Sequence, residues 1–171
     1  MSGTELSATK VGATQSPSVE SILATGLTRD LLAYFLRRLD DREDAADCLS
    51  ETLLVLWRRR RALPGDADGA RAWAFGTAKR VLANQRRGRI RHSTLTDRLR
   101  AELAIAPVAD GPALEVREAL AALAEDDREL MILIAWDGFG VAEAGALLGL
   151  KPDASRVRYY RARIRLRELL A

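Results

Sequence analysis

The segment 154–170 carries side chains suited to binding phosphates and base edges. It holds a run of arginines at Arg156, Arg158, Arg161, Arg163, Arg165 and Arg167. An arginine keeps its charge and presents a planar fork of N–H donors that matches phosphate oxygens and guanine edges. At about 100° per residue, a helix here places Val157, Tyr160 and Ile164 on one stripe between two rows of arginines. That combination suits a helix lying in the major groove of DNA.

The opposite side of this helix is a longer apolar stripe. It comprises Tyr159, Ala162, Leu166, Leu169 and Leu170, with Ser155 at its start, and we expect it to face the core. The residues expected to contact DNA are Ser155, Arg156, Arg158, Tyr160, Arg161, Arg163 and Arg165. Arg156 and Arg158, near the helix N-terminus, are best placed for base edges. The alternative is that the outward Val157, Tyr160 and Ile164 pack on another domain or on a partner protein.

A second basic block lies in residues 53–92, which carry 11 basic and 2 acidic side chains, against 6 and 1 in residues 154–171. Residues 1–52 carry 5 basic and 9 acidic side chains, and residues 93–153 carry 5 and 12. The formal charge of +3 therefore hides two cationic and two anionic stretches. A single basic run is more often a solvated helix face, but two concentrated blocks mixed with aromatic residues indicate phosphate binding at two places.

Residues that could carry catalysis are scarce. The chain has one cysteine, Cys48, and one histidine, His92. A disulfide within the chain is therefore impossible, and a Cys/His zinc site lacks ligands. A Cys/His nucleophile pair would require Cys48 and His92 to meet by accident. No cluster of carboxylates converges either. We expect a protein that is not an enzyme and uses no metal and no cofactor. No apolar run reaches the roughly 18 residues of a membrane span, and the N-terminus lacks a signal-peptide pattern, so we expect a cytoplasmic protein without membrane insertion.

The elements that position these side chains are expected to be helices. Residues 1–26 are rich in Ser, Thr, Gly and Ala and predict a flexible tail. The spacing of apolar residues then predicts helices over 28–39, 42–61 and 70–89, with a loop at 61–69. Residues 93–113 read as a linker, because the periodicity weakens and Pro107, Gly111 and Pro112 appear.

The C-terminal part, residues 114–171, is expected to end in a helix-turn-helix. A short helix at 141–148 precedes a turn at 149–153 and the arginine-rich helix. Gly145 lets the two helices cross closely, and Gly149 permits the positive φ of the turn. An ordinary helical hairpin is the alternative. No segment shows strand alternation, so the fold class is predicted as all-α, in two small helical domains joined by a linker.

Two sets of motifs, one in each predicted domain and in a fixed order, resemble those of a known family. In the first domain they are Asp41–Leu53 followed by Leu56-Trp57-Arg58, and then Ala72–Asn84 with Arg87. In the second they are Leu123, Arg128-Glu129, Ala142-Glu143, Leu147-Leu148-Gly149 and Tyr159–Arg167. Residues 30–92 and 114–171 thus resemble the two domains of extracytoplasmic-function (ECF, group 4) sigma factors, the promoter-recognition subunits of bacterial RNA polymerase.

The resemblance implies a factor that binds RNA polymerase core and directs promoter-specific initiation. Residues 27–92 would be sigma region 2, which docks on the clamp helices of the β′ subunit and reads the −10 element. Residues 114–171 would be sigma region 4, which reads the −35 element, and the β subunit is a further polymerase contact. Many such factors are held inactive by an anti-sigma factor, so one is an expected partner here.

The resemblance also implies roles for the remaining charged residues. The polymerase-facing residues would be Asp44, Asp47 and Glu51, whose spacing of three and four places them on one helical face. The residues near the −10 DNA would be Arg61, Lys79, Arg80, Asn84, Arg86 and Arg87. Trp57 and Trp73 lie on apolar stripes and are expected in the core. The sequence departs from the family pattern at Thr77, Asn84, Ala144-Gly145 and Ser155, where packing is expected to be weaker.

Two other classes of protein stay open at this point. A stand-alone helix-turn-helix regulator would bind duplex DNA as a dimer, without polymerase. An interaction module would use its arginine faces to bind an acidic protein, and its binding to DNA would be absent or insensitive to salt.

Overall fold

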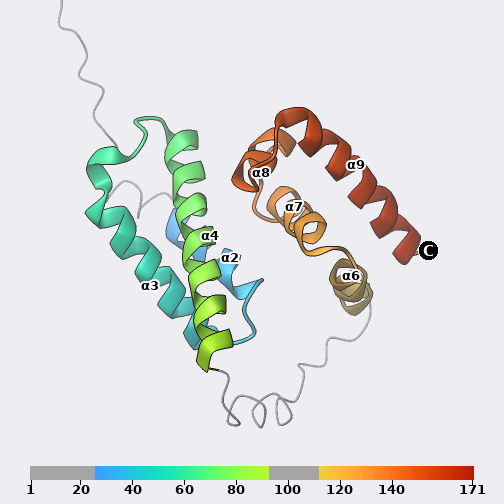
Figure 1. Ribbon diagram of the computed structural model, residues 1–171, viewed down its shortest axis with the longest axis horizontal. Helices are drawn as coiled ribbons and strands as arrows, with labels where there is room; N and C mark the ends of the chain where they lie inside the picture. Colours follow the sequence, from blue (N-terminus) through green and yellow to red (C-terminus); the bar gives the residue numbers. More distant parts are fainter. Residues whose placement is uncertain (1–25, 93–111) are drawn as a thin grey trace, which may run out of the picture.

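The structure, a computed structural model, describes residues 26–92 and 112–171, and within these ranges every regular element is helical (Figure 1). The predicted all-α fold class is confirmed. The predicted N-terminal tail and the predicted linker fall almost wholly outside the described residues.

The N-terminal helices are α2 (Leu27–Leu36), α3 (Arg42–Arg58), the short 3-10 turn η1 (Arg60–Ala62) and α4 (Ala67–His92). Helix α3 begins where Asp41 caps it, because the Asp41 carboxylate accepts the Glu43 N–H at 2.7 Å. Helices α3 and α4 pack side by side and both contact α2 (Figure 1).

The predicted loop at 61–69 is shorter in the structure. Residues 60–62 form the 3-10 turn, and α4 starts at Ala67 rather than near residue 70. The reason is Asp66, whose carboxylate accepts the Gly69 N–H at 2.6 Å and satisfies the first turn of α4.

The C-terminal helices are α6 (Pro112–Ala121), α7 (Glu125–Ala135), α8 (Val141–Leu147) and α9 (Pro152–Leu169). The turn between α7 and α8 uses the positive φ of Gly138. Helix α8 then begins with Glu143 accepting the Gly140 N–H at 2.8 Å. In Figure 1, α9 lies on the side of the C-terminal helices away from α3.

The main hydrophobic core crosses both sets of helices. The sequence predicts two small domains, each with its own core. In the structure Tyr34 and Phe75 from the N-terminal helices share one cluster with Leu130, Leu133 and Phe139 from the C-terminal part. The Phe75 and Phe139 rings meet edge to face with centroids 4.9 Å apart. A smaller cluster of Leu120, Leu123, Met131 and Ala162 belongs to the C-terminal helices alone.

The two tryptophans behave differently from one another. Trp73 packs against the main core, as predicted, but Trp57 is 53% exposed, so its assignment to the core is wrong. The buried face of α3 consists of Ala45, Cys48, Thr52 and Leu56. Trp57 follows Leu56 directly and is therefore turned about 100° from that face.

Candidate nucleic-acid interface

Helices α8 and α9 cross at very short range. A Cβ placed on Gly145 would lie 1.7 Å from the Ser155 Oγ and 2.4 Å from its Cβ, so only glycine fits at this position. Gly149 in the connecting turn has φ +77°, as its predicted role requires. The close crossing and the turn together give the predicted helix-turn-helix its geometry.

Helix α9 presents two different faces. Ala162 is buried, and Tyr159, Leu166 and Leu169 pack against the smaller cluster. On the outward face Val157 is 50%, Tyr160 62% and Ile164 38% exposed. The predicted division into a core stripe and an outward stripe is therefore confirmed, except for Leu170. Leu170 was expected in the core stripe but is 44% exposed, because it lies just beyond the last residue of α9.

The arginines beside the outward stripe lie at the surface. Arg156 pairs with Asp153 at 2.8 Å, and Arg165 pairs with Glu168 at 3.2 Å. Arg161 and Arg163 are exposed as well. Exposed pairs of this kind contribute about 0–1 kcal/mol, so a DNA phosphate can replace the carboxylate at little cost.

Arg158 is held more firmly than its neighbours. It contacts Asp126 at 3.0 Å and Asp127 at 3.3 Å, both in the first turn of α7. Its side chain is 35% exposed, so a DNA contact requires that it leave these carboxylates.

Ser155 is misassigned as a DNA contact. The side chain is fully buried against Gly145, and its hydroxyl donates to the Lys151 carbonyl oxygen at 2.9 Å. The close crossing of α8 encloses it. Ser155 belongs to the packing of the helix-turn-helix.

Helix α4 carries a second basic surface. Arg80, Asn84, Arg86 and Arg87 are exposed, and Arg61 is exposed in η1. The Asn84 side-chain oxygen accepts from Arg87 at 2.5 Å, and Arg86 pairs with Glu125 of α7 at 2.9 Å.

Lys79 lies apart from that surface. It is partly buried and its Nζ donates to the Leu147 carbonyl oxygen at 2.8 Å. Leu147 ends α8, so in this structure Lys79 joins the two halves of the protein.

Helix α3 carries the predicted acidic face. Asp47 and Glu51 are exposed, whereas Asp44 is partly buried and accepts from the Gln85 side chain at 3.0 Å. Leu54 and Trp57 on the same helix are 52% and 53% exposed, and no prediction from the sequence placed apolar side chains at this surface. The regular spacing of Ala45, Cys48, Thr52 and Leu56 already fills the buried face of α3, and this spacing could have predicted that Leu54 and Trp57 are exposed.

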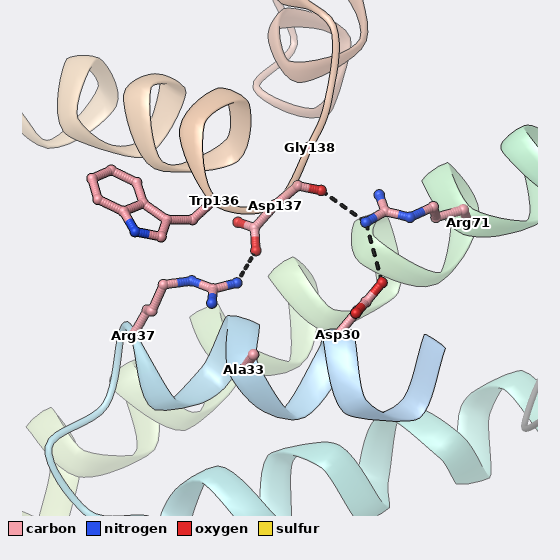
Figure 2. Close-up of a pocket in the computed structure, with 7 residues that line it drawn as sticks. All are labelled: Asp30, Ala33, Arg37, Arg71, Trp136, Asp137 and Gly138. Carbon is pink, nitrogen blue, oxygen red and sulfur yellow. Dashed lines mark hydrogen bonds and ion pairs between the residues drawn. The ribbon is translucent and has the colours of Figure 1, made fainter. Parts of the chain in front are cut away.

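A cavity of about 240 Å³ lies where the two halves meet (Figure 2). It is lined by Asp30, Ala33, Arg37, Arg71, Trp136, Asp137 and Gly138. Ligand pockets usually occupy about 300–1,000 Å³. Arg37 already pairs with Asp137, and Arg71 pairs with Asp30. The charges of both arginines are therefore already neutralised and do not favour binding of an anionic ligand.

Groups suited to metal binding or nucleophilic attack do not gather in the described chain. Within residues 26–92 and 112–171, no three His, Cys, Asp or Glu side chains are placed to hold a metal ion. Burial raises the pKa of the Cys48 thiol to about 11, which keeps it protonated and unreactive. Among the described helices, none has the length and apolar character that crossing a membrane requires.

Comparison with known proteins relates both halves of the chain to one family. Residues 23–92 match the Sigma-70 region 2 family, and residues 113–166 match the family described as Sigma-70, region 4. The ECF RNA polymerase sigma factor SigF of Caulobacter vibrioides is 34% identical over 134 residues, covering 77% of this chain and 74% of that protein. The chain belongs to the ECF RNA polymerase sigma factors. It is an alternative sigma factor that directs transcription initiation.

Other members of this sigma factor family agree. The ECF sigma factor SigL of Mycobacterium tuberculosis is 29% identical over 148 residues, covering 81% of this chain and 84% of its own. Among solved structures, the sigma factor RpoE of Bartonella quintana, in complex with the anti-sigma factor NepR, is 27% identical with a TM-score of 0.65, covering 88% of this chain and 94% of that one. CnrH, in complex with the cytosolic domain of CnrY, is 26% identical with a TM-score of 0.59, covering 88% and 85%.

Proposed function

We propose that this sigma factor is of group 4 and divides promoter recognition between its two halves. Residues 27–92 act as region 2, which binds core polymerase and the −10 element, and residues 114–171 act as region 4, which reads the −35 element. The observation that carries this proposal is the outward face of α9, where Val157, Tyr160 and Ile164 stay exposed between rows of arginines.

The −35 element is read by the first half of α9. Arg156 and Arg158 lie near the helix N-terminus, the end that contacts base edges in a helix-turn-helix. Arg161, Arg163 and Arg165 follow along the exposed surface and bind phosphates, while Tyr160 contacts thymine methyls.

The −10 element is bound by the exposed surface of α4. Arg80, Arg86 and Arg87 supply charge for phosphates, and Asn84 supplies an amide for a base edge. Arg61 approaches the same DNA from η1. Lys79 joins this set once it releases the Leu147 carbonyl.

Core polymerase is bound by the acidic face of α3. Asp47 and Glu51 are exposed on one face and are complementary to basic side chains of the β′ clamp helices. Asp44 fixes that face to α4 through Gln85. The protein acts in the cytoplasm, where it contributes recognition while the polymerase, including its β subunit, supplies the catalysis.

An anti-sigma factor is a further partner. The solved relatives RpoE and CnrH are both complexes, one with the anti-sigma factor NepR and one with CnrY. The exposed Val157, Tyr160 and Ile164 offer an apolar surface that such an inhibitor can cover.

The test is promoter binding by reconstituted holoenzyme carrying Arg156→Ala and Arg158→Ala. We expect the preference for the −35 sequence to fall at least tenfold, because each base contact of this kind contributes about 1–3 kcal/mol, while binding to core stays unchanged. The matched control is Arg117→Ala, which removes one exposed arginine from α6. Loss of core binding in the double variant would contradict the proposal, as would tight, specific binding to duplex DNA without polymerase.

A further inference from the structure

A surface that is both basic and aromatic lies where α3 ends. Trp57 is 53% exposed near the end of α3. Exposed arginines follow it without interruption, through the end of α3 and into η1: Arg58, Arg59, Arg60 and Arg61. In the part of the chain that the structure describes, none of these four arginines is paired with a carboxylate. The surface at 57–61 therefore offers positive charge beside an aromatic ring.

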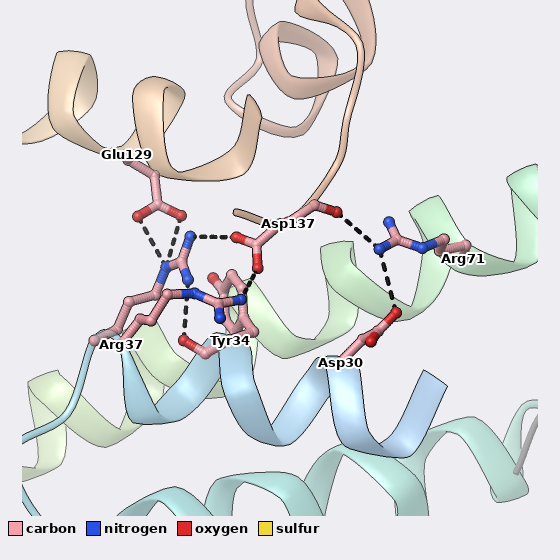
Figure 3. A network of polar contacts seen from close by, with 7 residues as sticks. Asp30, Tyr34, Arg37, Arg71, Glu129 and Asp137 are labelled. Carbon is pink, nitrogen blue, oxygen red and sulfur yellow. Dashed lines mark hydrogen bonds and ion pairs between the residues drawn. The ribbon is translucent and has the colours of Figure 1, made fainter. Parts of the chain in front are cut away.

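Three other arginines of the N-terminal helices are used inside the protein. Arg37 and Arg38 donate to the two carboxylate oxygens of the buried Asp137, and Arg71 donates to its backbone carbonyl oxygen at 2.8 Å (Figure 3). Those charges join the two halves of the chain. A cation at the C-terminal end of a helix is favoured by the helix dipole, but that effect falls off within the last turn. It does not explain the arginines at 60 and 61, which lie beyond α3.

The Trp57 ring is held in place by its neighbours. The Arg60 guanidinium lies 4.9 Å from the centre of the ring, and its Nη1 donates to the Trp57 carbonyl oxygen at 3.2 Å. Leu56 before the surface is 3% exposed and Leu63 after it is 7% exposed, so the segment between them is anchored at both ends. A ring that is fixed and half exposed loses little conformational entropy when it stacks on a flat partner.

Trp57 does not lie on the acidic face of α3. At about 100° per residue, it points about 80° away from Asp47 and about 120° away from Glu51. The residues on its own side of the helix, at spacings of four and three, carry no charge: Ala46, Ser50 and Leu53. The basic partner proposed for the acidic face would be repelled by the arginines at 58–61, whereas a polyanion would be attracted. The charge of this surface therefore favours a nucleic acid.

An exposed tryptophan can stack on the face of an unpaired base. Inside a duplex both faces of a base are covered by its neighbours, and proteins that bind single strands combine a basic surface for the phosphates with aromatic rings for the bases. Figure 1 shows that α3 ends and α4 begins at the same end of the N-terminal helices. Arg80 comes 13 residues after Ala67, the first residue of α4, which is about 20 Å along the helix. At about 3.4 Å per stacked base, this distance spans about six nucleotides. A strand that runs along α4 therefore reaches the surface at 57–61 with different nucleotides.

We propose that Trp57 and the arginines at 58–61 form a sequence-independent binding site for single-stranded DNA, which takes the melted strand beside the −10 element. Trp57 stacks on one base, and the arginines bind the neighbouring phosphates. The ring touches only the face of a base, so the site holds the strand whatever its sequence. The proposal rests on the proposed role of α4 at the −10 element.

The test is binding of the full-length protein to a fluorescein-labelled oligothymidine strand, measured by anisotropy at low salt. Trp57→Ala should weaken binding at least about fivefold, the loss expected when one base loses its stacking partner. Trp57→Phe should keep most of the affinity, because a phenyl ring also stacks. The matched control is Trp136→Ala, which removes a tryptophan of similar exposure, 50%, from the C-terminal half and should leave binding unchanged.

The arginines are tested through the salt dependence of the same binding. Arg58→Ala with Arg59→Ala should reduce the slope of log affinity against log salt by about 1.4, since each phosphate contact on a single strand contributes about 0.7. This pair also keeps the test decisive should Trp57→Ala fail to fold. The control is Arg29→Ala with Arg117→Ala, which removes two exposed arginines elsewhere and should leave the slope unchanged.

The site is overturned if the wild-type protein does not bind the strand, if Trp57→Ala binds it as tightly as the wild type, or if Trp136→Ala weakens binding equally. A loss of affinity for core polymerase in Trp57→Ala, with binding of the strand unchanged, would assign the surface to the polymerase instead. Promoter selection by wild-type holoenzyme tests the proposed roles of α4 and α9 separately, because it depends on sequences that this site does not read.

Discussion

At the scale of single residues, Gly145 and Ser155 show how far helical spacing can predict a site. The spacing places Ser155 at the start of the core stripe of α9, and the structure buries it there. The prediction that Ser155 contacts DNA is wrong because Gly145 brings α8 so close. Distances between two helices are not contained in the periodicity of either one.

Gly145 and Ser155 both depart from the family pattern, and weaker packing was expected there. The two residues fit against each other, and this contact offsets the expected loss. Ser155 fills the space beside Gly145, and its hydroxyl is satisfied by the Lys151 carbonyl. Thr77 is satisfied in the same way by the Trp73 carbonyl at 3.0 Å. Gly145 and Ser155 are therefore a matched pair, since the small serine side chain fills the space that the glycine leaves open.

The matched pair predicts the result of an exchange. Gly145→Ala should destabilise the protein by about 1–3 kcal/mol, because the new Cβ has no room. Adding Ser155→Gly removes both close contacts and leaves the nearest atom, the Cα of residue 155, at 3.6 Å, so the double variant should recover most of that loss. Thermal unfolding measures both. A double variant as unstable as Gly145→Ala alone would show that the crossing is not the constraint.

At the scale of elements, the spacing of apolar residues predicts where the helices lie. It predicts their first residues less accurately, because these depend on capping side chains. The helices predicted over 28–39, 42–61, 70–89, 141–148 and 154–170 are all present, yet α4 begins earlier because Asp66 caps it, and Trp57 lies on the surface. Both errors have a local cause in the sequence. Asp66 lies three residues before Gly69 and caps α4. The buried face of α3 is already filled by Ala45, Cys48, Thr52 and Leu56, which leaves Trp57 outside it.

The exposed acidic face of α3 predicts its own test. Asp47→Ala with Glu51→Ala should weaken binding to core polymerase about tenfold at low salt, since each exposed charge pair contributes up to about 1 kcal/mol. The difference should shrink as salt increases. The control is Glu115→Ala with Glu118→Ala, which removes the same charge from the exposed surface of α6. Equal weakening by both pairs would point to overall charge rather than to this face.

At the scale of the whole molecule, the sequence could not predict how the halves pack. The turn at residues 137–140 is the junction between them, through Asp137 and Phe139. Periodicity reports which face of a helix is buried, but it does not say which distant helix covers that face. Arg37, Arg38 and Arg71 have no feature in the sequence that marks them as partners of one aspartate.

Promoter-specific initiation by this sigma factor is tested most directly by sequencing the 5′ ends of transcripts that are made on genomic DNA by holoenzyme reconstituted from core polymerase and this protein. We expect start sites that are absent with core alone and that share two upstream elements near −10 and −35. Start sites identical to those of core alone, or without shared upstream elements, would contradict it.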